Sequence, residues 1–171
     1  MSNLMNGGDG LPVATGAYVV GIHLPHLRVI RVGKLGEIAF PPGEYLYVGS
    51  AFGPGGLRAR LGRHLRGGGR PHWHIDALRA VAPVRGFWYT VTTELLECRW
   101  SQLLAGLPQA TIPAPRFGAS DCRAGCLAHL VALPAGADLS AVQAKLVTVA
   151  GASVVAVTSA GVVACGPCHV Q

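Results

Sequence analysis

Apolar residues 1–50 occur in short alternating or continuous runs separated by turns, a pattern typical of β-strands. Residues 16–24 form a β-rich apolar run, and residues 28–32 alternate polar with apolar side chains. Two further extended runs follow at 37–40 and 44–49, separated by a Pro-Pro-Gly turn. We therefore expect this part of the chain to form a small antiparallel meander.

The pattern changes to a helical period after a Gly/Pro-rich loop. Leu57, Leu61 and Leu65 recur at intervals of four residues, which predicts one helix with an apolar stripe. Residues 72–82 are expected to be helical and 87–91 to form a strand. Thr93 is expected to cap a third helix, whose apolar stripe is Leu96, Trp100, Leu103 and Leu107. A last strand is predicted within 127–133, so the fold class is α+β, a small antiparallel or mixed sheet flanked by helices.

The two ends differ in composition from the middle. Residues 1–14 are expected to be a flexible leader, 15–133 the domain, and 134–171 an apolar extension rich in Ala, Val and Gly. Residues 146–164 contain no charged side chain, but their many β-branched residues favour a loosely ordered or strand-forming tail over a membrane anchor. No stable membrane association is expected.

Composition narrows the class of partner. The chain of 171 residues has 14 Lys and Arg against 8 Asp and Glu, a net charge of +6. A basic protein of this size favours an acidic partner such as nucleic acid, although a basic surface without such a partner is the alternative. We find no signal peptide, and the five cysteines do not form a secreted disulfide framework, so a cytoplasmic location is expected.

The first predicted helix is strongly basic. No acidic residue lies between Glu44 and Asp76, so the arginines of this segment must face solvent or line a cleft. Arginine side chains match phosphate oxygens well, and a solvated helix face is the alternative. The residues predicted to bind nucleic acid are Arg58, Arg63, Arg66, Arg70, His72 and His74.

Two strand segments resemble a known signature. Gly16-Ala17-Tyr18 and Tyr47-Val48-Gly49, followed by Arg60 and later by Glu97, resemble the GIY-YIG nuclease superfamily. The chain is similar to one uncharacterised branch of this superfamily, whose members occur alone or fused to endonuclease III-type DNA glycosylases. The similar segments are GEYLYVGSAFGPGGLRARLGRHL, HWHID, ELLEC and FGASDC. The resemblance covers about Thr15 to Leu133 and implies a GIY-YIG-like fold.

The resemblance also implies a chemistry, the hydrolysis of phosphodiester bonds in DNA. Tyr18 and Tyr47 would act on the attacking water, Arg60 on the phosphate, and Glu97 on a bound Mg²⁺ or Mn²⁺. A free tyrosine has a pKa of about 10, so a metal and an arginine would have to lower it for Tyr18 to act as a base. His64, one turn after Arg60, is a candidate for proton transfer or phosphate binding. Glu94 is the rival metal ligand.

Histidine and cysteine residues form three further groups. His72 and His74 are separated by one residue, which is unsuitable for two ligands on one helix face. Cys122, Cys126 and His129 supply three soft ligands, one fewer than a closed zinc site needs, so His72 or His74 would have to complete it. Structural cysteines without a metal are the preferred interpretation. The Cys165-Gly-Pro-Cys168-His169 sequence matches a haem-attachment or redox pattern but is interpreted as chance or weak metal binding.

The sequence thus predicts a metal-dependent DNA endonuclease with a role in DNA repair. A base-excision glycosylase is the expected functional neighbour. One alternative is a nucleic-acid-binding module on the same fold without catalysis. The other is a small metal-binding protein built on the His and Cys residues.

Overall fold

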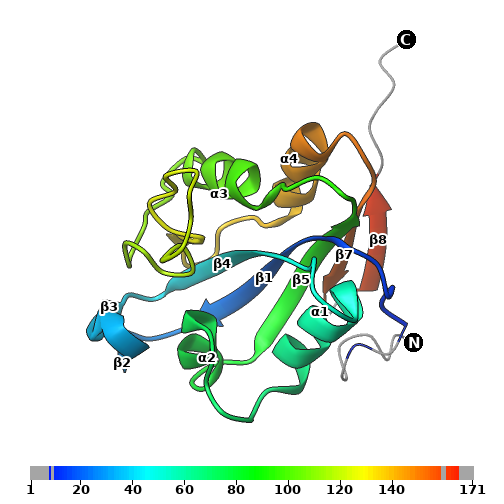
Figure 1. Ribbon diagram of the computed structural model, residues 1–171. Helices are drawn as coiled ribbons and strands as arrows, with labels where there is room; N and C mark the ends of the chain where they lie inside the picture. The colour runs from blue at the N-terminus through cyan, green and yellow to red at the C-terminus, as the bar shows by residue number, and fades with distance from the viewer. Residues whose placement is uncertain (1–7, 9, 159–160, 166–171) are drawn as a thin grey trace.

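The computed structural model describes residues 8, 10–158 and 161–165, and an antiparallel sheet forms its centre (Figure 1). Every pair of neighbouring strands in this sheet runs antiparallel. In spatial order the strands are β6 (Leu130–Pro134), β4 (Gly43–Ser50), β1 (Gly16–Leu24), β5 (Val84–Val91), β7 (Val154–Thr158) and β8 (Gly161–Cys165). The expected α+β class is confirmed.

A second, two-stranded sheet joins β1 to β4. Strands β2 (Arg28–Arg31) and β3 (Glu37–Phe40) pair in antiparallel register around the short 3₁₀ helix η2 (Gly33–Leu35). The strands expected in the first third of the chain are therefore present, but β2 and β3 leave the main sheet. Ile30 and Phe40 are buried against the main core and attach this hairpin to it.

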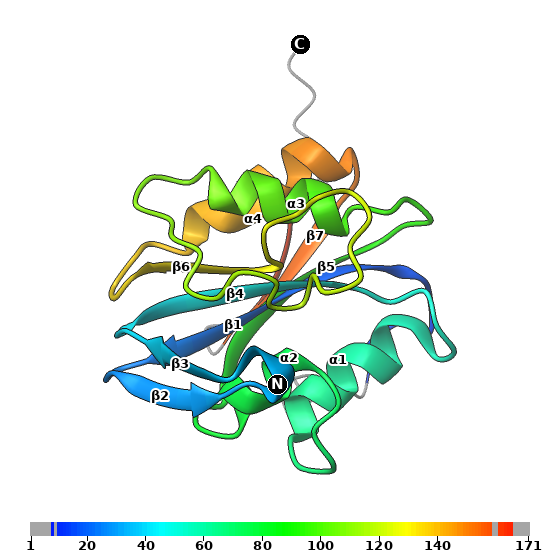
Figure 2. The ribbon, with the colours of Figure 1, turned by 60° about the vertical axis from the view of Figure 1, so that its left-hand side comes forward.

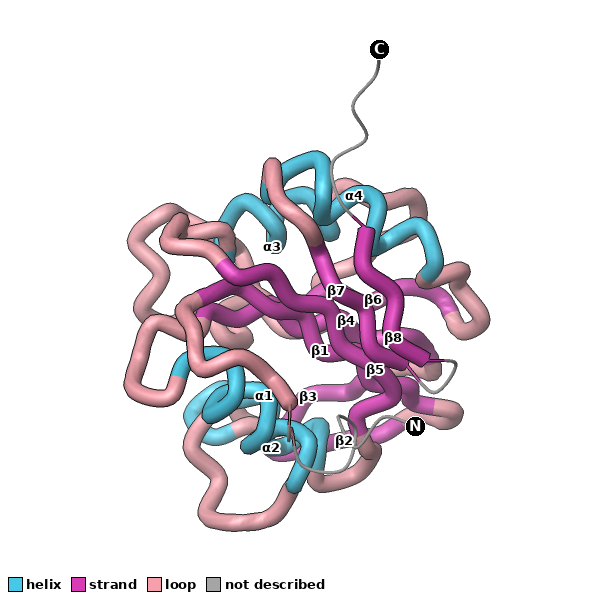
Figure 3. The backbone as a smooth tube through the Cα atoms, turned by 90° about the vertical axis from the view of Figure 1, so that its right-hand side faces the viewer, coloured by secondary structure: helices cyan, strands magenta, loops and turns pink. Residues whose placement is uncertain are grey.

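Helices cover both faces of the sheet (Figures 2 and 3). Alternation along the strands sends successive side chains to opposite faces, which creates two separate cores. On one face, Tyr18 and Tyr47 pack with α1 (Gly56–Arg66) and α2 (His74–Arg79). On the other face, α3 (Glu97–Ala105) and α4 (Ser140–Ala150) pack on the sheet.

The segment after Leu133 is integrated into the fold, which differs from the expected boundary. Strand β7 pairs with β5 from Gly86↔Thr158 to Tyr89↔Val155, and Leu146 of α4 is fully buried beside Val154. The β-branched run therefore does form strands, while residues 140–150 are helical. In the described part of the chain, no helix is long and apolar enough to cross a membrane.

Residues 11–14 also pack on the domain instead of belonging to a leader. Leu11 is fully buried, and the backbone oxygen atoms of Pro12 and Ala14 accept hydrogen bonds from Arg58 and Leu57 at the start of α1. The rest of the expected leader, residues 1–7 and 9, lies outside the described residues.

Helix α3 begins three residues later than the sequence indicated. The backbone N–H of Glu94 donates to Oγ1 of Thr92, which bends the chain into a turn where Thr93 was expected to cap the helix. The helix therefore starts at Glu97, with Leu96 and Trp100 buried beneath it. This late start places Glu97 in the first turn.

The packing of α4 generates a stability prediction. Replacing the fully buried Leu146 with Ala removes apolar contacts and leaves a cavity, which should reduce the free energy of unfolding by about 3 kcal/mol. Lys145→Ala, one residue earlier on the exposed side of the helix, is the matched control and should change it by about 0.5 kcal/mol or less. Urea denaturation of both variants measures the difference. Equal stabilities would mean that α4 contributes nothing to the domain.

Candidate functional site

The structure brings four of the predicted site residues around one cleft of about 460 Å³. Tyr18 and Tyr47 come from β1 and β4, Arg60 from α1, and Glu97 from α3. The other residues lining this cleft are Gly49, Ser50, Trp73, Leu95, Cys98, Gly118, Asp121, Cys122, Arg123, Ala124 and His129. Residues from distant parts of the sequence therefore share a single concave surface.

The cleft lies at the edge of the sheet where β4 ends, and residues from both faces of the sheet line it. Helices α1 and α3 cover opposite faces, but Glu97 is the first residue of its helix and Ser50 the last of its strand. The Ser50 hydroxyl donates a hydrogen bond of 2.9 Å to Oε2 of Glu97. This bond holds the Glu97 carboxylate beside the end of β4, so the carboxylate lines the same cleft as Arg60.

Two glycines leave room for the tyrosine rings. Tyr18 and Gly49 are direct partners across β1 and β4, and a Cβ atom at Gly49 would lie 2.4 Å from the Tyr18 hydroxyl. A Cβ atom at Gly118 would lie 2.7 Å from Cε2 of Tyr47. Gly118 also has a φ of 71°, which disfavours other residues. A side chain at either position would displace a tyrosine.

Tyr18 is paired with His64, a residue below the cleft. The Tyr18 hydroxyl lies 3.0 Å from Nε2 of His64, and both side chains are buried. Burial raises the pKa of Tyr18 above its ordinary value, and the charge of Arg60 offsets only part of this. Burial, together with the charges of Arg79, Arg63 and Arg60, lowers the pKa of His64 to about 3. Arg60 alone therefore does not bring the pKa of Tyr18 below its ordinary value.

Tyr47 is similarly protonated. Burial raises the pKa of its phenol well above the ordinary value, and the neighbouring Tyr18 and Glu97 reinforce the effect. Its ring meets Phe117 and His64 edge to face. Both tyrosines enter the cleft as neutral hydroxyl groups.

Arg60 is half-buried and faces the cleft beside an aromatic ring. Its guanidinium carbon lies 4.6 Å from the centre of the Trp73 ring, a cation–π contact. The contact orients the charge without neutralising it, so the guanidinium keeps its hydrogen-bond donors for an anion. Trp73 itself lines the cleft.

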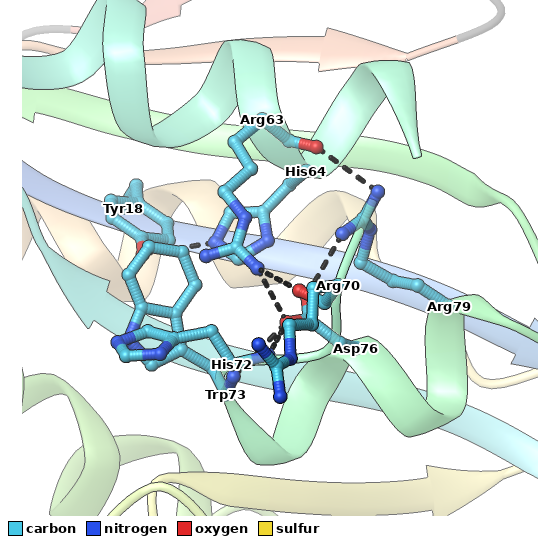
Figure 4. A network of polar contacts seen from close by, with 8 residues as sticks. All are labelled: Tyr18, Arg63, His64, Arg70, His72, Trp73, Asp76 and Arg79. Atoms are coloured by element: carbon cyan, nitrogen blue, oxygen red, sulfur yellow. Dashed lines mark hydrogen bonds and ion pairs between the residues drawn. The ribbon is translucent and has the colours of Figure 1, made fainter. Parts of the chain in front are cut away.

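Arg63 belongs to a structural network centred on Asp76 (Figure 4). Its Nη2 donates to Oδ2 of Asp76 at 2.7 Å, and Arg79 donates to Oδ1 at 3.0 Å. The backbone N–H groups of His72 and Trp73 donate to Oδ2 as well. Burial would raise the pKa of Asp76, but these four partners outweigh it and lower the pKa. Arg63 is thus engaged in holding α1 to α2, a use that differs from its predicted contact with nucleic acid.

The remaining basic candidates lie at the surface or hold local structure. Arg66, Arg70 and His72 are exposed. Nε of the exposed Arg58 also donates to the backbone oxygen of Leu11 at 2.9 Å. Nδ1 of His74 accepts a hydrogen bond of 3.0 Å from the backbone N–H of Gly118 and so fixes the loop beneath Tyr47.

Sequence reasoning did not assign two charged residues that line the cleft. Asp121 and Arg123 are exposed in the loop before β6 and line the cleft together with Glu97 and Arg60. Asp121 belongs to the FGASDC segment, but only the folding of the loop brings Asp121 to the cleft that α3 also lines. Glu94, the rival ligand, is exposed and pairs with Arg99 at 3.4 Å; it does not line the cleft.

The oxygen atoms in the cleft suit a hard divalent cation. Glu97 and Asp121 supply carboxylates, and the two oxygens of Glu97 keep lone pairs besides those facing Ser50 and His129. Mg²⁺ and Mn²⁺ prefer carboxylate and water oxygens, so these two residues fit such an ion.

A cysteine and histidine cluster adjoins the same carboxylate. The ligand atoms of Cys98, Cys122, Cys126 and His129 all lie within 4.8 Å of one another. Cys98 completes the group, which corrects the expectation that His72 or His74 would do so; both histidines contact Trp73 or Gly118 instead. Of the C-terminal Cys-x-x-Cys-His, Cys165 ends β8 and residues 166–171 lie outside the described part of the structure.

Comparison with known proteins places this fold in a family. A family model described as a domain of unknown function, DUF123, matches residues 17–151. The chain belongs to the DUF123 family. The DUF123 match extends beyond Leu133 through α4, in agreement with the packing of that helix. No curated protein and no solved structure gives a significant match.

The Asp76 network predicts a pH-dependent stability. Asp76→Asn leaves the buried Arg79 without its counter-charge and should cost about 3 kcal/mol of unfolding free energy at pH 7. Because the pKa of Asp76 is lowered by folding, its contribution is present above pH 4 and is lost as the pH falls further. Urea denaturation at pH 7 and at pH 3 should show the difference from wild type narrowing in acid.

Glu37→Gln is the matched control for this prediction. It breaks the exposed Arg31–Glu37 pair, 3.6 Å long, and should cost about 0.5 kcal/mol or less at both pH values. An Asp76→Asn variant as stable as Glu37→Gln would contradict the structural role of the network.

Proposed function

We propose that this DUF123 protein is a metal-dependent endonuclease of the GIY-YIG type that hydrolyses phosphodiester bonds in DNA. The supporting observation is the convergence of Tyr18, Tyr47, Arg60 and Glu97 on one cleft. These residues also occupy the positions that the resemblance to GIY-YIG nucleases assigns to catalysis. The resemblance further supports a role in DNA repair beside a base-excision glycosylase.

Arg60 is the residue proposed to bind the scissile phosphate. Its guanidinium is oriented by Trp73 and has donors that match two phosphate oxygens. Charge on these oxygens grows in the transition state, so a fixed cation beside them stabilises the transition state more than the ground state. Exposed Arg123, which also lines the cleft, adds positive charge for the DNA backbone.

Tyr18 and His64 are proposed to handle the proton of the attacking water. A free phenolate is unfavourable here because burial raises the pKa of Tyr18. Instead, the phenol oxygen accepts the water proton while the phenol O–H passes its own proton to Nε2 of His64, 3.0 Å away. A bound phosphate neutralises Arg60, one of the charges that lower the pKa of His64, and so favours this transfer. Tyr47 orients the water or phosphate through its neutral hydroxyl.

Glu97 is proposed to hold the divalent cation. When bound, Mg²⁺ or Mn²⁺ supplies polarisation of the phosphate and stabilises the leaving oxygen. The hydrogen bond from Ser50 fixes the Glu97 carboxylate in the direction of the cleft, and Asp121 offers a second oxygen ligand from the loop.

Cleavage assays on branched, flapped and single-stranded DNA, with and without Mg²⁺, test this proposal. Wild-type protein should cut at least one substrate, and only with the metal. Glu97→Gln keeps the size of the side chain but removes its charge, so cleavage should fall by about 100-fold or more while DNA binding persists. Glu94→Gln, three residues earlier and exposed, is the matched control and should cut like wild type. Equal cleavage by Glu97→Gln would refute the role of Glu97, and DNA binding without any cleavage would favour the non-catalytic binding module.

DNA binding itself should depend on the exposed arginines after Arg63. Removing Arg66 and Arg70 together should reduce the slope of log affinity against log salt by about two units if both contact phosphate. Arg28→Ala with Arg31→Ala, on the separate β2–β3 hairpin, is a control with the same loss of charge. Fluorescence anisotropy over a range of salt concentrations measures both slopes. Identical slopes in the two double variants would show that net charge, not this surface, determines binding.

A further inference from the structure

The cysteine and histidine cluster has the composition of a zinc site. Cys122, Cys126 and His129 come from one loop, and Cys98 comes from the first turn of α3. Three thiols and one imidazole are soft or borderline ligands, which bind Zn²⁺ well and Mg²⁺ poorly. The cluster is therefore chemically distinct from the oxygen ligands of the cleft, although the two groups are neighbours.

We propose that Cys98, Cys122, Cys126 and His129 bind one structural Zn²⁺. In a tetrahedral site with Zn–S bonds of about 2.3 Å, ligand atoms lie roughly 3.8 Å apart. Here Sγ of Cys98 lies 3.5 Å from Sγ of Cys122 and 4.0 Å from Nε2 of His129. Four ligands complete the coordination shell, so the site is closed and structural, without an open position for water.

The orientation of His129 indicates which nitrogen faces the metal. Nε2 points toward Cys98, whereas Nδ1 is buried and lies 3.0 Å from Oε1 of Glu97. Apart from this ion-pair contact, Nδ1 has no hydrogen-bond partner. Metal-bound histidines commonly donate the other ring N–H to a carboxylate, which fixes the ring and the tautomer. Glu97 stands where such a carboxylate is needed.

The zinc would fix the wall of the cleft. The loop is closed at its base by backbone hydrogen bonds from Arg116 to Leu127 and from His129 to Phe117. Between these contacts, residues 120–127 include few buried side chains, so packing alone holds this segment weakly. A metal bridge to Cys98 would tie the segment to α3 and so hold Asp121 and Arg123 at the cleft that Arg60 also lines. This role goes beyond the proposed nuclease activity and does not depend on it.

Metal analysis of the untagged full-length protein tests the site. Inductively coupled plasma mass spectrometry of protein purified without chelator should find about one zinc ion per chain. Cys98→Ser and Cys122→Ser should each lose most of this zinc, while Cys165→Ser, a cysteine outside the cluster, should keep it. Replacement of zinc by Co²⁺ should give the intense visible bands of tetrahedral thiolate coordination.

Two measurements keep the test informative where a cysteine variant fails to fold. Chelator treatment of the wild-type protein should lower its melting temperature, and Zn²⁺ but not Mg²⁺ should restore it. Glu97→Gln should keep its zinc because Glu97 is not a ligand, whereas Glu97→Ala should weaken zinc affinity by about 10-fold or more in a chelator competition.

Three results would overturn the proposal. They are protein free of zinc with no response to added Zn²⁺, a disulfide between Cys98 and Cys122 in freshly purified protein, and zinc that remains after both cysteine substitutions. Each result is read from metal content, redox state or melting temperature. Failure of the zinc site is therefore distinguishable from failure of the nuclease proposal, which is read from cleavage.

Discussion

The pairing of Tyr18 with Gly49 across β1 and β4 is the constraint on which the cleft depends. Cross-strand partners on one face normally compete for the space between their side chains. Because Gly49 has none, the Tyr18 ring lies over the neighbouring strand, and its hydroxyl reaches the position that a Cβ atom would otherwise occupy. That placement sets the distance from Tyr18 to His64 on α1, and Ser50, the next residue of β4, reaches Glu97. The absence of a side chain at Gly49 thus allows Tyr18 to contact α1, while the adjacent Ser50 contacts α3.

Burial, reinforced by the surrounding charges, lowers the pKa of His64 and explains its neutral state below the cleft. Arg60, Arg63 and Arg79 surround His64, and all three disfavour a protonated imidazole. Asp76 neutralises Arg63 and Arg79 but lies with them in the same network, so it only partly offsets their effect. A neutral His64 is able to accept a hydrogen bond from Tyr18, which a charged ring cannot do. The arginines of the basic helix therefore differ in their surroundings. Arg60 and Arg63 lower the pKa of His64, whereas Arg58 and Arg66 are exposed at the surface.

The sequence was most informative where periodicity and local motifs act over a few residues. The strand at Gly16–Leu24 and the helix marked by Leu57, Leu61 and Leu65 follow from side-chain spacing alone. The resemblance named the residues that the fold assembles around one cleft, among them Arg60 and Glu97. Contacts between distant segments were not predictable in this way. Cys98 joins a loop 24 residues further along, and the β-branched run that forms β7 carries no sign of its partner β5. The partner of Arg63 was also hidden, because α2 turns Asp76 back toward α1 only in the folded protein.

The two metals that we propose would have separate roles on either side of the contact between Glu97 and His129. The thiol ligands of Cys98, Cys122 and Cys126 would disfavour a hard cation in the cluster, and the oxygen ligands of the cleft would bind zinc less strongly than the cluster. The Glu97 carboxylate stands between them, with one oxygen beside His129 and the other bonded to Ser50. An imidazole bound to the proposed zinc through Nε2 would keep its N–H directed at Glu97, which would orient the carboxylate and restrict its rotation. A carboxylate held from both sides would be preorganised for the proposed cation of the cleft, so its conformational entropy would be lost on folding and not at each turnover.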